Sequence, residues 1–128
     1  MNSKINNFYN KIKTKYNIDL TKTDDVLKLQ YDERDNANTI VTKIQRILTI
    51  SSDIRKLAKN IKTMLRQNKL SRSSKNNLSR DINKLNNITN TLNDYHKSLI
   101  DNRLIVLSRD KAFQETQTLN DNTEVSVD

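Results

Sequence analysis

The chain has 128 residues, a formal net charge of +8, and no Gly, Pro, Cys or Trp. The residues usual in tight turns, left-handed helix caps and disulfides are therefore missing. A β-rich fold would need several such turns, whereas a few long helices need almost none. With 34% hydrophobic and 5% aromatic residues, the chain can fill a narrow seam but not a broad core. We predict an all-α protein of one domain, either thin or oligomeric.

Neither a membrane span nor a secretory signal is recognisable. No stretch approaches the roughly 18 consecutive apolar residues of a membrane-spanning helix. No apolar signal-peptide core follows Met1. The expectation is an intracellular protein without a transmembrane segment.

Residues 3–16 are predicted to form a short amphipathic helix. Its apolar and aromatic side chains recur at spacings of three and four residues: Ile5, Phe8, Tyr9, Ile12 and Tyr16. Lysines occupy much of the remaining surface. A helix of this length is marginal alone in water, so its apolar face must dock on the rest of the chain, on a partner or on a membrane surface. Docking on the rest of the chain is the favoured interpretation.

Two heptad series follow, on predicted helices over residues 24–66 and 74–114. Their seam consists of Ile40, Ile47, Ile54, Ile61, Leu78, Leu85, Leu92 and Leu99. Seven-residue spacing returns a side chain to the same helix face. Folding the chain between Leu65 and Leu78 brings Ile61 near Leu78 and Ile40 near Leu99. The pattern predicts an antiparallel hairpin of two helices, each of about 40 residues and about 60 Å long.

A continuous helix is the rival architecture, because the heptad keeps its phase across the middle of the chain. A single rod in a parallel coiled coil would then preserve the register. Three intervening seam positions are polar, namely Asn68, Ser71 and Lys75. They lie in a segment rich in residues that cap helices and form turns. These features favour the hairpin, with Thr23 expected to cap the first of its two helices.

The last residues, 115–128, differ from the rest of the chain. They lose the heptad periodicity and contain four acidic residues but no Lys or Arg. Such a composition is typical of a disordered segment. We predict a disordered acidic tail.

Basic residues concentrate around the predicted turn, which we call the tip. They are Arg55, Lys56, Lys59, Lys62, Arg66, Lys69, Arg72, Lys75, Arg80 and Lys84, and the only acid in this stretch is Asp81. Clustered Lys and Arg side chains bind polyanions by releasing condensed counterions. The alternative is a solvated face with no specific partner, in a composition rich in Lys, Asn and Ile.

Catalytic and metal-binding patterns are absent from the sequence. The chain has one His and no Cys, whereas metal sites commonly use both residue types. His96 is interpreted as a side chain at the edge of the seam, and without Gly there is no phosphate-binding loop. We therefore expect no enzyme, no cofactor and no small-molecule substrate.

Apolar residues outside the seam indicate how the protein acts. Five of them exceed what a two-helix contact needs: Val41, Leu48, Ile100, Leu104 and Leu107. The sequence therefore predicts a structural or interaction subunit that assembles through apolar helix faces, either with itself or with a helical protein partner. The alternative is a module that binds nucleic acid or an anionic membrane through the basic tip and the Lys-rich first helix.

Overall fold

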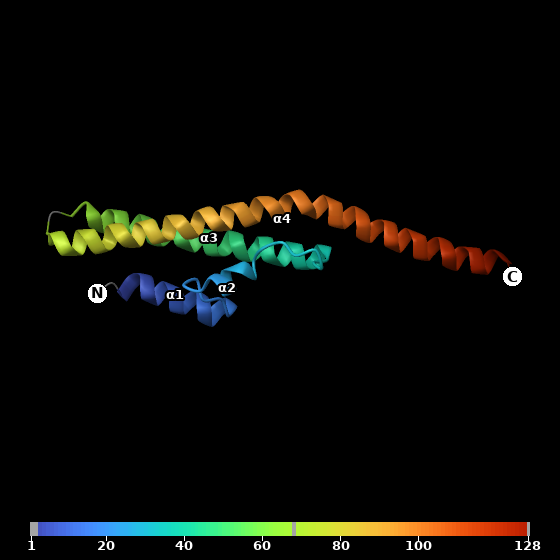
Figure 1. The fold of residues 1–128 in the computed structure, drawn as a ribbon, viewed down its shortest axis with the longest axis horizontal. Coiled ribbons are helices and arrows are strands. Elements are labelled where there is room, and N and C mark those ends of the chain that lie inside the picture. Colours follow the sequence, from blue (N-terminus) through green and yellow to red (C-terminus); the bar gives the residue numbers. More distant parts are fainter. Residues whose placement is uncertain (1–2, 68, 128) are drawn as a thin grey trace.

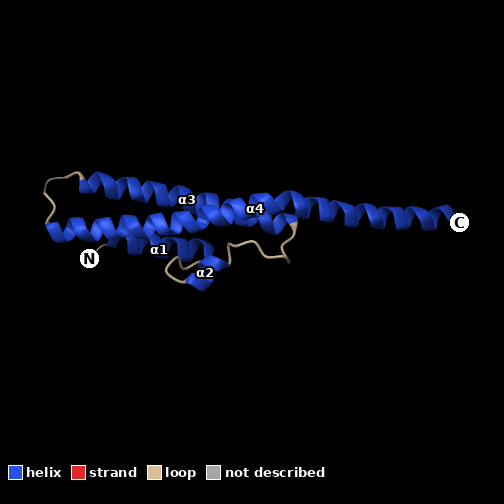
Figure 2. Ribbon diagram, turned by 45° about the horizontal axis from the view of Figure 1, so that its top comes forward, coloured by secondary structure: helices blue, strands red, loops and turns tan. Residues whose placement is uncertain are grey.

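The fold is a helical hairpin with two shorter helices along one side (Figure 1). The computed structural model describes residues 3–67 and 69–127, and the side chains of residues 4–67 and 69–111. In these ranges the helices are α1 (Ser3–Tyr16), α2 (Thr23–Leu27), α3 (Ala37–Leu65) and α4 (Arg72–Val127). The described residues include no strand. Figure 2 shows α3 and α4 side by side with a loop at one end. The predicted all-α hairpin is confirmed.

The predicted seam forms the core between α3 and α4. Each of its eight residues is at most 5% exposed, and Val106 continues the series on α4 with no exposed surface. Burying a side chain of this size contributes about 1.5–3 kcal/mol relative to leaving it exposed. The heptad spacing thus produces one continuous apolar contact along the hairpin.

The chain reverses direction between Leu65 and Arg72, where the sequence predicts a fold-back. At the start of α4, the Ser71 hydroxyl accepts a hydrogen bond from the Ser74 backbone N–H at 3.1 Å. A side-chain acceptor at this position satisfies one of the free N–H groups of a helix start. This cap explains why α4 begins two residues before the predicted position 74. Asn68 lies outside the described residues.

The predicted helix over residues 24–66 is wrong, because the chain leaves the helical path between α2 and α3. Local side-chain hydrogen bonds form here in place of helical ones. Asp35 Oδ2 accepts from the Asp32 N–H at 3.0 Å, and Asn36 Oδ1 accepts from the Thr39 N–H at 2.8 Å. Asp and Asn favour such turns and caps over a helix interior. The cap expected at Thr23 is also wrong, since Thr23 is already helical and Lys22 precedes it without a side-chain cap.

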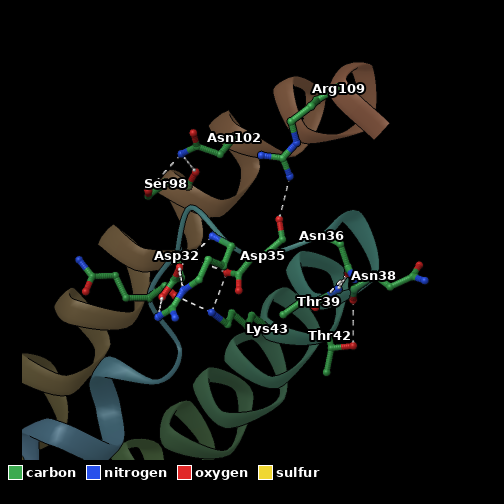
Figure 3. Close-up of polar contacts among 12 residues, drawn as sticks. Asp32, Asp35, Asn36, Asn38, Thr39, Thr42, Lys43, Ser98, Asn102 and Arg109 are labelled. Carbon is green, nitrogen blue, oxygen red and sulfur yellow. Dashed lines mark hydrogen bonds and ion pairs between the residues drawn. The ribbon is translucent and has the colours of Figure 1, made fainter. Parts of the chain in front are cut away.

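A polar cluster holds the start of α3 against α4 (Figure 3). Asp35 is 7% exposed, and its Oδ2 accepts a hydrogen bond from Lys43 Nζ at 2.7 Å. From α4, Arg109 donates to the Asp35 backbone carbonyl at 3.2 Å. The Ala37 N–H donates to Asp110 Oδ2 at 3.3 Å. These contacts fix where the two helices begin to pair.

The first helix docks on the hairpin through its predicted apolar face. Ile5, Phe8 and Ile12 are buried. Burial of the Tyr9 phenol raises its pKa, and the negative charge of Asp81 on α4 adds to this effect. The Tyr16 ring, half-buried, lies 5.9 Å from the guanidinium of Arg46 on α3. The hairpin therefore buries the predicted apolar face of α1.

Helix α1 ends in a left-handed residue, which is Asn17 with φ 57°. Gly usually fills this position, and Asn is the next most tolerant residue. The Asn17 N–H donates to the Lys13 carbonyl at 2.8 Å, which closes the last turn. The absence of Gly is thus compatible with a sharp turn into the connection between α1 and α2.

The two long helices differ in length, which corrects two expectations. The 29 residues of α3 limit the paired length to about 44 Å instead of about 60 Å. Helix α4 has 56 residues and projects past the start of α3 (Figure 1). The sequence predicts a helix end at 114 and a disordered tail over 115–128, whereas α4 continues to Val127. Asp128 lies outside the described residues.

Candidate functional site

The hairpin has two faces, one on each side of its buried seam. A helix turns about 100° per residue, so the residues before and after a seam residue point to opposite sides. Because α3 and α4 are antiparallel, the residues that follow a seam residue on either helix share one side. We call this side the uncovered face, and the opposite side the covered face. The uncovered face comprises Val41, Leu48, Arg55, Lys62, Ser79, Asn86, Asn93, Ile100 and Leu107.

Helices α1 and α2 lie on the covered face. Asp53, which precedes a seam isoleucine of α3, lines a shallow cleft together with Phe8 of α1. Thr91, which precedes a seam leucine of α4, lines another cleft together with Val26 of α2. These contacts place the whole N-terminal segment on one side of the seam. No other described element lies across the uncovered face (Figure 2).

At the open end of the hairpin, away from the tip, the uncovered face is apolar. Leu48 is 51% exposed, Ile100 42% and Leu107 39%. Leu104, one helical turn after Ile100, borders this face and is 72% exposed. Val41 is half-buried. The five apolar residues expected to be in excess therefore remain accessible on the described structure.

Toward the tip, the uncovered face holds a groove between α3 and α4. Its volume is about 340 Å³. We call it the basic groove, and the polar residues that line it are Arg55, Lys59, Lys62, Thr63, Arg66, Asn86 and Thr89. The four bases recur at spacings of four, three and four residues, which places them along one side of α3 and its C-cap residue Arg66. The lining includes no acid, and none of these bases forms an ion pair with a described residue.

The other predicted tip bases do not join this groove. Lys56 lies on the covered face, where it lines a cleft with Lys4 and Lys11 of α1. Lys75 is half-buried. The bases outside the basic groove are Lys56, Lys69, Arg72, Lys75, Arg80 and Lys84. Only part of the predicted basic cluster therefore forms one surface.

Four residues of interest were not singled out by the sequence. Asn86 and Thr89 line the basic groove from α4, and their position next to the seam is the pattern that would have identified them. Leu27 and Ile105 are exposed apolar residues, 43% and 65% accessible. Both lie outside the uncovered face, so they serve as controls for it.

Metal-binding geometry is absent from the described part of the chain. No group of three or more His, Cys, Asp or Glu side chains could hold an ion there. His96 is half-buried, at the edge of the seam as expected. Over the same residues, no helix is long and apolar enough to cross a membrane.

Comparisons with known proteins do not add a relative. No protein-family model, curated protein or solved structure matches the chain.

Proposed function

We propose that this chain is a structural or interaction subunit that assembles through the apolar part of its uncovered face, with itself or with a helical protein. The observation that carries the proposal is the group of exposed side chains Leu48, Ile100, Leu104 and Leu107 at the open end. Association would remove apolar surface of each side chain from contact with water, and this burial is favourable by about 25 cal/mol per Å². Adjacent exposed apolar residues on both helices are typical of a contact surface.

The same side chains contribute little to the fold itself. The core is complete without them, because the seam residues are buried between α3 and α4 and the α1 face is buried against the hairpin. Packing within the chain therefore does not account for apolar residues at these accessible positions. Contact with a second helix or helix pair supplies a reason.

Sedimentation equilibrium over a range of concentrations tests the proposal. The test variant replaces Leu48, Ile100, Leu104 and Leu107 with Gln, and the control variant replaces Leu27, exposed on α2, with Gln. We expect the wild type and the control to exceed the mass of one chain or to form a complex with a helical protein, and the test variant to do neither. A wild type that stays a monomer, and whose Leu48 position forms no crosslink to a helical protein, would contradict the proposal.

A second candidate function is binding of a polyanion at the tip. It is favoured by the basic groove, whose four exposed bases lack acidic neighbours in its lining. No aromatic residue lines the groove, so base stacking is not part of this interpretation. Binding would follow the phosphate backbone or an anionic lipid surface and would weaken steeply with salt.

Retention on heparin and on duplex DNA tests this second candidate. The variant replaces the four groove bases, Arg55, Lys59, Lys62 and Arg66, with Gln, while the control replaces Lys4, Lys11, Lys13 and Lys15. Loss of retention in the first variant alone, with unchanged helicity, would support the polyanion function. Equal retention of both variants, or no retention of the wild type at physiological salt, would eliminate it.

A further inference from the structure

The uncovered face changes character along its length. On α3, the residues that follow the seam isoleucines are Val41, Leu48, Arg55 and Lys62, which are apolar at the open end and basic near the tip. On α4, Asn86 lies beside the basic residues of this face, and Ile100 lies at its apolar end. The exposed residues Leu48, Ile100, Leu104 and Leu107, which we call the apolar patch, and the basic groove therefore lie along the same side of the hairpin.

From this surface we infer the chemistry of the partner: an amphipathic helix whose residues facing the hairpin are apolar in one half and acidic in the other. This inference rests on the proposed function and specifies it. The span from Val41 to Lys62 is about 32 Å at 1.5 Å per residue, which matches a partner helix of about six turns. A helix lying between two others is a common mode of protein recognition.

Charge complementarity selects an acidic partner. Arg55, Lys59, Lys62 and Arg66 are exposed on one side of the basic groove, and its described lining has no acid to neutralise them. Carboxylates on the partner would pair with these bases, while a neutral or basic helix would not. The apolar half would supply the buried contact, and the basic half would fix the direction of the bound helix.

A second copy of this chain does not meet these requirements through the same face. Juxtaposing two uncovered faces places the bases of each copy against either the bases or the apolar half of the other. The acids nearest to the groove in sequence are Asp53 and Asp81. Asp53 lines the cleft against α1 on the covered face, and Asp81 is buried and influences Tyr9 on that face. The uncovered face of a second copy is therefore not the partner, and we assign the site to a helix of the stated chemistry on a different protein.

Three synthetic helical peptides of about 22 residues test the inference, with binding to the full chain followed by fluorescence anisotropy. All three share a Leu seam in one half, and the groove-facing positions of the other half carry Glu, Gln or Lys. We expect the Glu peptide to bind about tenfold or more tightly than the Gln peptide, since three or four exposed ion pairs add up to this difference. The Lys peptide should not bind.

Matched variants locate the binding site. Replacing Arg55, Lys59 and Lys62 with Gln should raise the Kd of the Glu peptide about tenfold, and Leu48→Gln should raise it as well. Replacing Lys11, Lys13 and Lys56 with Gln removes the same charge elsewhere and should leave the Kd unchanged. Helicity of every variant is checked by circular dichroism.

Two other outcomes would overturn the inference. If all three peptides bind equally or none binds, while heparin binds the wild type and the Leu48→Gln variant alike, the groove recognises polyanions instead of a helix. If the wild type self-associates and Leu48→Gln abolishes this, the face joins two copies of the chain. In that case the proposed function stands although the inference about the partner fails.

Discussion

The two faces of the hairpin flank the same seam but differ in how their apolar side chains are covered. On the covered face, Phe8 and Ile12 of α1 are buried against the hairpin, whereas Leu48 and Leu104 at the other face are 51% and 72% exposed. The heptad repeat does not create this difference, because it specifies only the seam. The side on which α1 docks creates it. The chain therefore carries a helical cover for one face and leaves the other available.

The two faces also differ in charge. Asp53 and Asp81 lie toward the covered face, and the basic groove on the other face is lined by four bases without an acid. Lys4 and Lys11 of α1 line a cleft together with Asp53, whereas the lining of the basic groove includes no acid. The two faces of the hairpin therefore differ both in apolar coverage and in charge, and they share one core.

The seam supports both faces, so damage to it should have the largest effect. Ile54→Asp places a charge at a position that is 2% exposed. Because a buried, unpaired charge is poorly solvated, we expect the free energy of unfolding to fall by about 4 kcal/mol. Urea denaturation followed by circular dichroism measures this change. An unchanged midpoint would mean that Ile54 does not face a core.

The packing of α1 on the covered face should depend strongly on its large buried side chain, Phe8. Phe8 is 8% exposed, and truncation to Ala leaves a cavity between α1 and α3. We expect a loss of about 3 kcal/mol and faster amide exchange throughout α1. Asn10→Ala, an exposed change on the same helix, serves as the control. If both variants unfold alike, α1 does not dock as described.

The position of the segment between α2 and α3 should depend on one ion pair. Lys43 Nζ lies 2.7 Å from Asp35 Oδ2, and both side chains are largely buried, at 17% and 9% exposed. Lys43→Met leaves the carboxylate without this partner and should cost about 2 kcal/mol. The control is Lys28→Met, because the Lys28–Asp25 pair is exposed and such pairs contribute less than about 1 kcal/mol. Thermal unfolding of the two variants should therefore differ, and equal melting temperatures would contradict a structural role for the buried pair.

Acid should lower the local stability of residues 17–36 by a smaller amount. The pKa of Asp19 is lowered by a hydrogen bond from the Thr21 side chain, that of Asp25 by the Asp19 N–H, and that of Asp32 by the Arg34 N–H. A pKa lower in the folded state means that ionisation stabilises the fold above the ordinary carboxyl pKa of about 4. This contribution disappears as the pH falls below that value. Amide exchange of residues 17–36 between pH 6 and pH 3 measures it, and protection that does not decrease would contradict the assignment.

Much of the fold could be predicted because the seam repeats every seven residues, and so could the α1 bounds. The break between α2 and α3 could not, since Asp35 and Asn36 act through hydrogen bonds to nearby backbone N–H groups. A heptad pattern does not reveal such competition between local and helical hydrogen bonds. The apolar seam thins at the polar residues Glu33, Asn36 and Lys43, which is a weak indication of a break in the sequence itself.

The candidate site was predictable only in part. Exposed Leu48 and Leu104 were expected from the excess of apolar residues, and the concentration of bases was evident. The sequence could not show that Arg55 and Lys62 share a face with Leu48 and Ile100 while Lys56 lies with α1. That division depends on which side α1 occupies, which is a tertiary contact.

Thiol labelling of two neighbouring positions tests the contrast between seam and uncovered face most directly. The chain has no Cys, so Ile47→Cys and Leu48→Cys each introduce a single reactive group, at positions that are 1% and 51% exposed. We predict labelling of the Leu48→Cys variant at nearly the rate of a free thiol, and labelling of the Ile47→Cys variant at least about a hundredfold slower, because it requires local opening. Similar rates at the two positions in the monomeric protein would contradict the account.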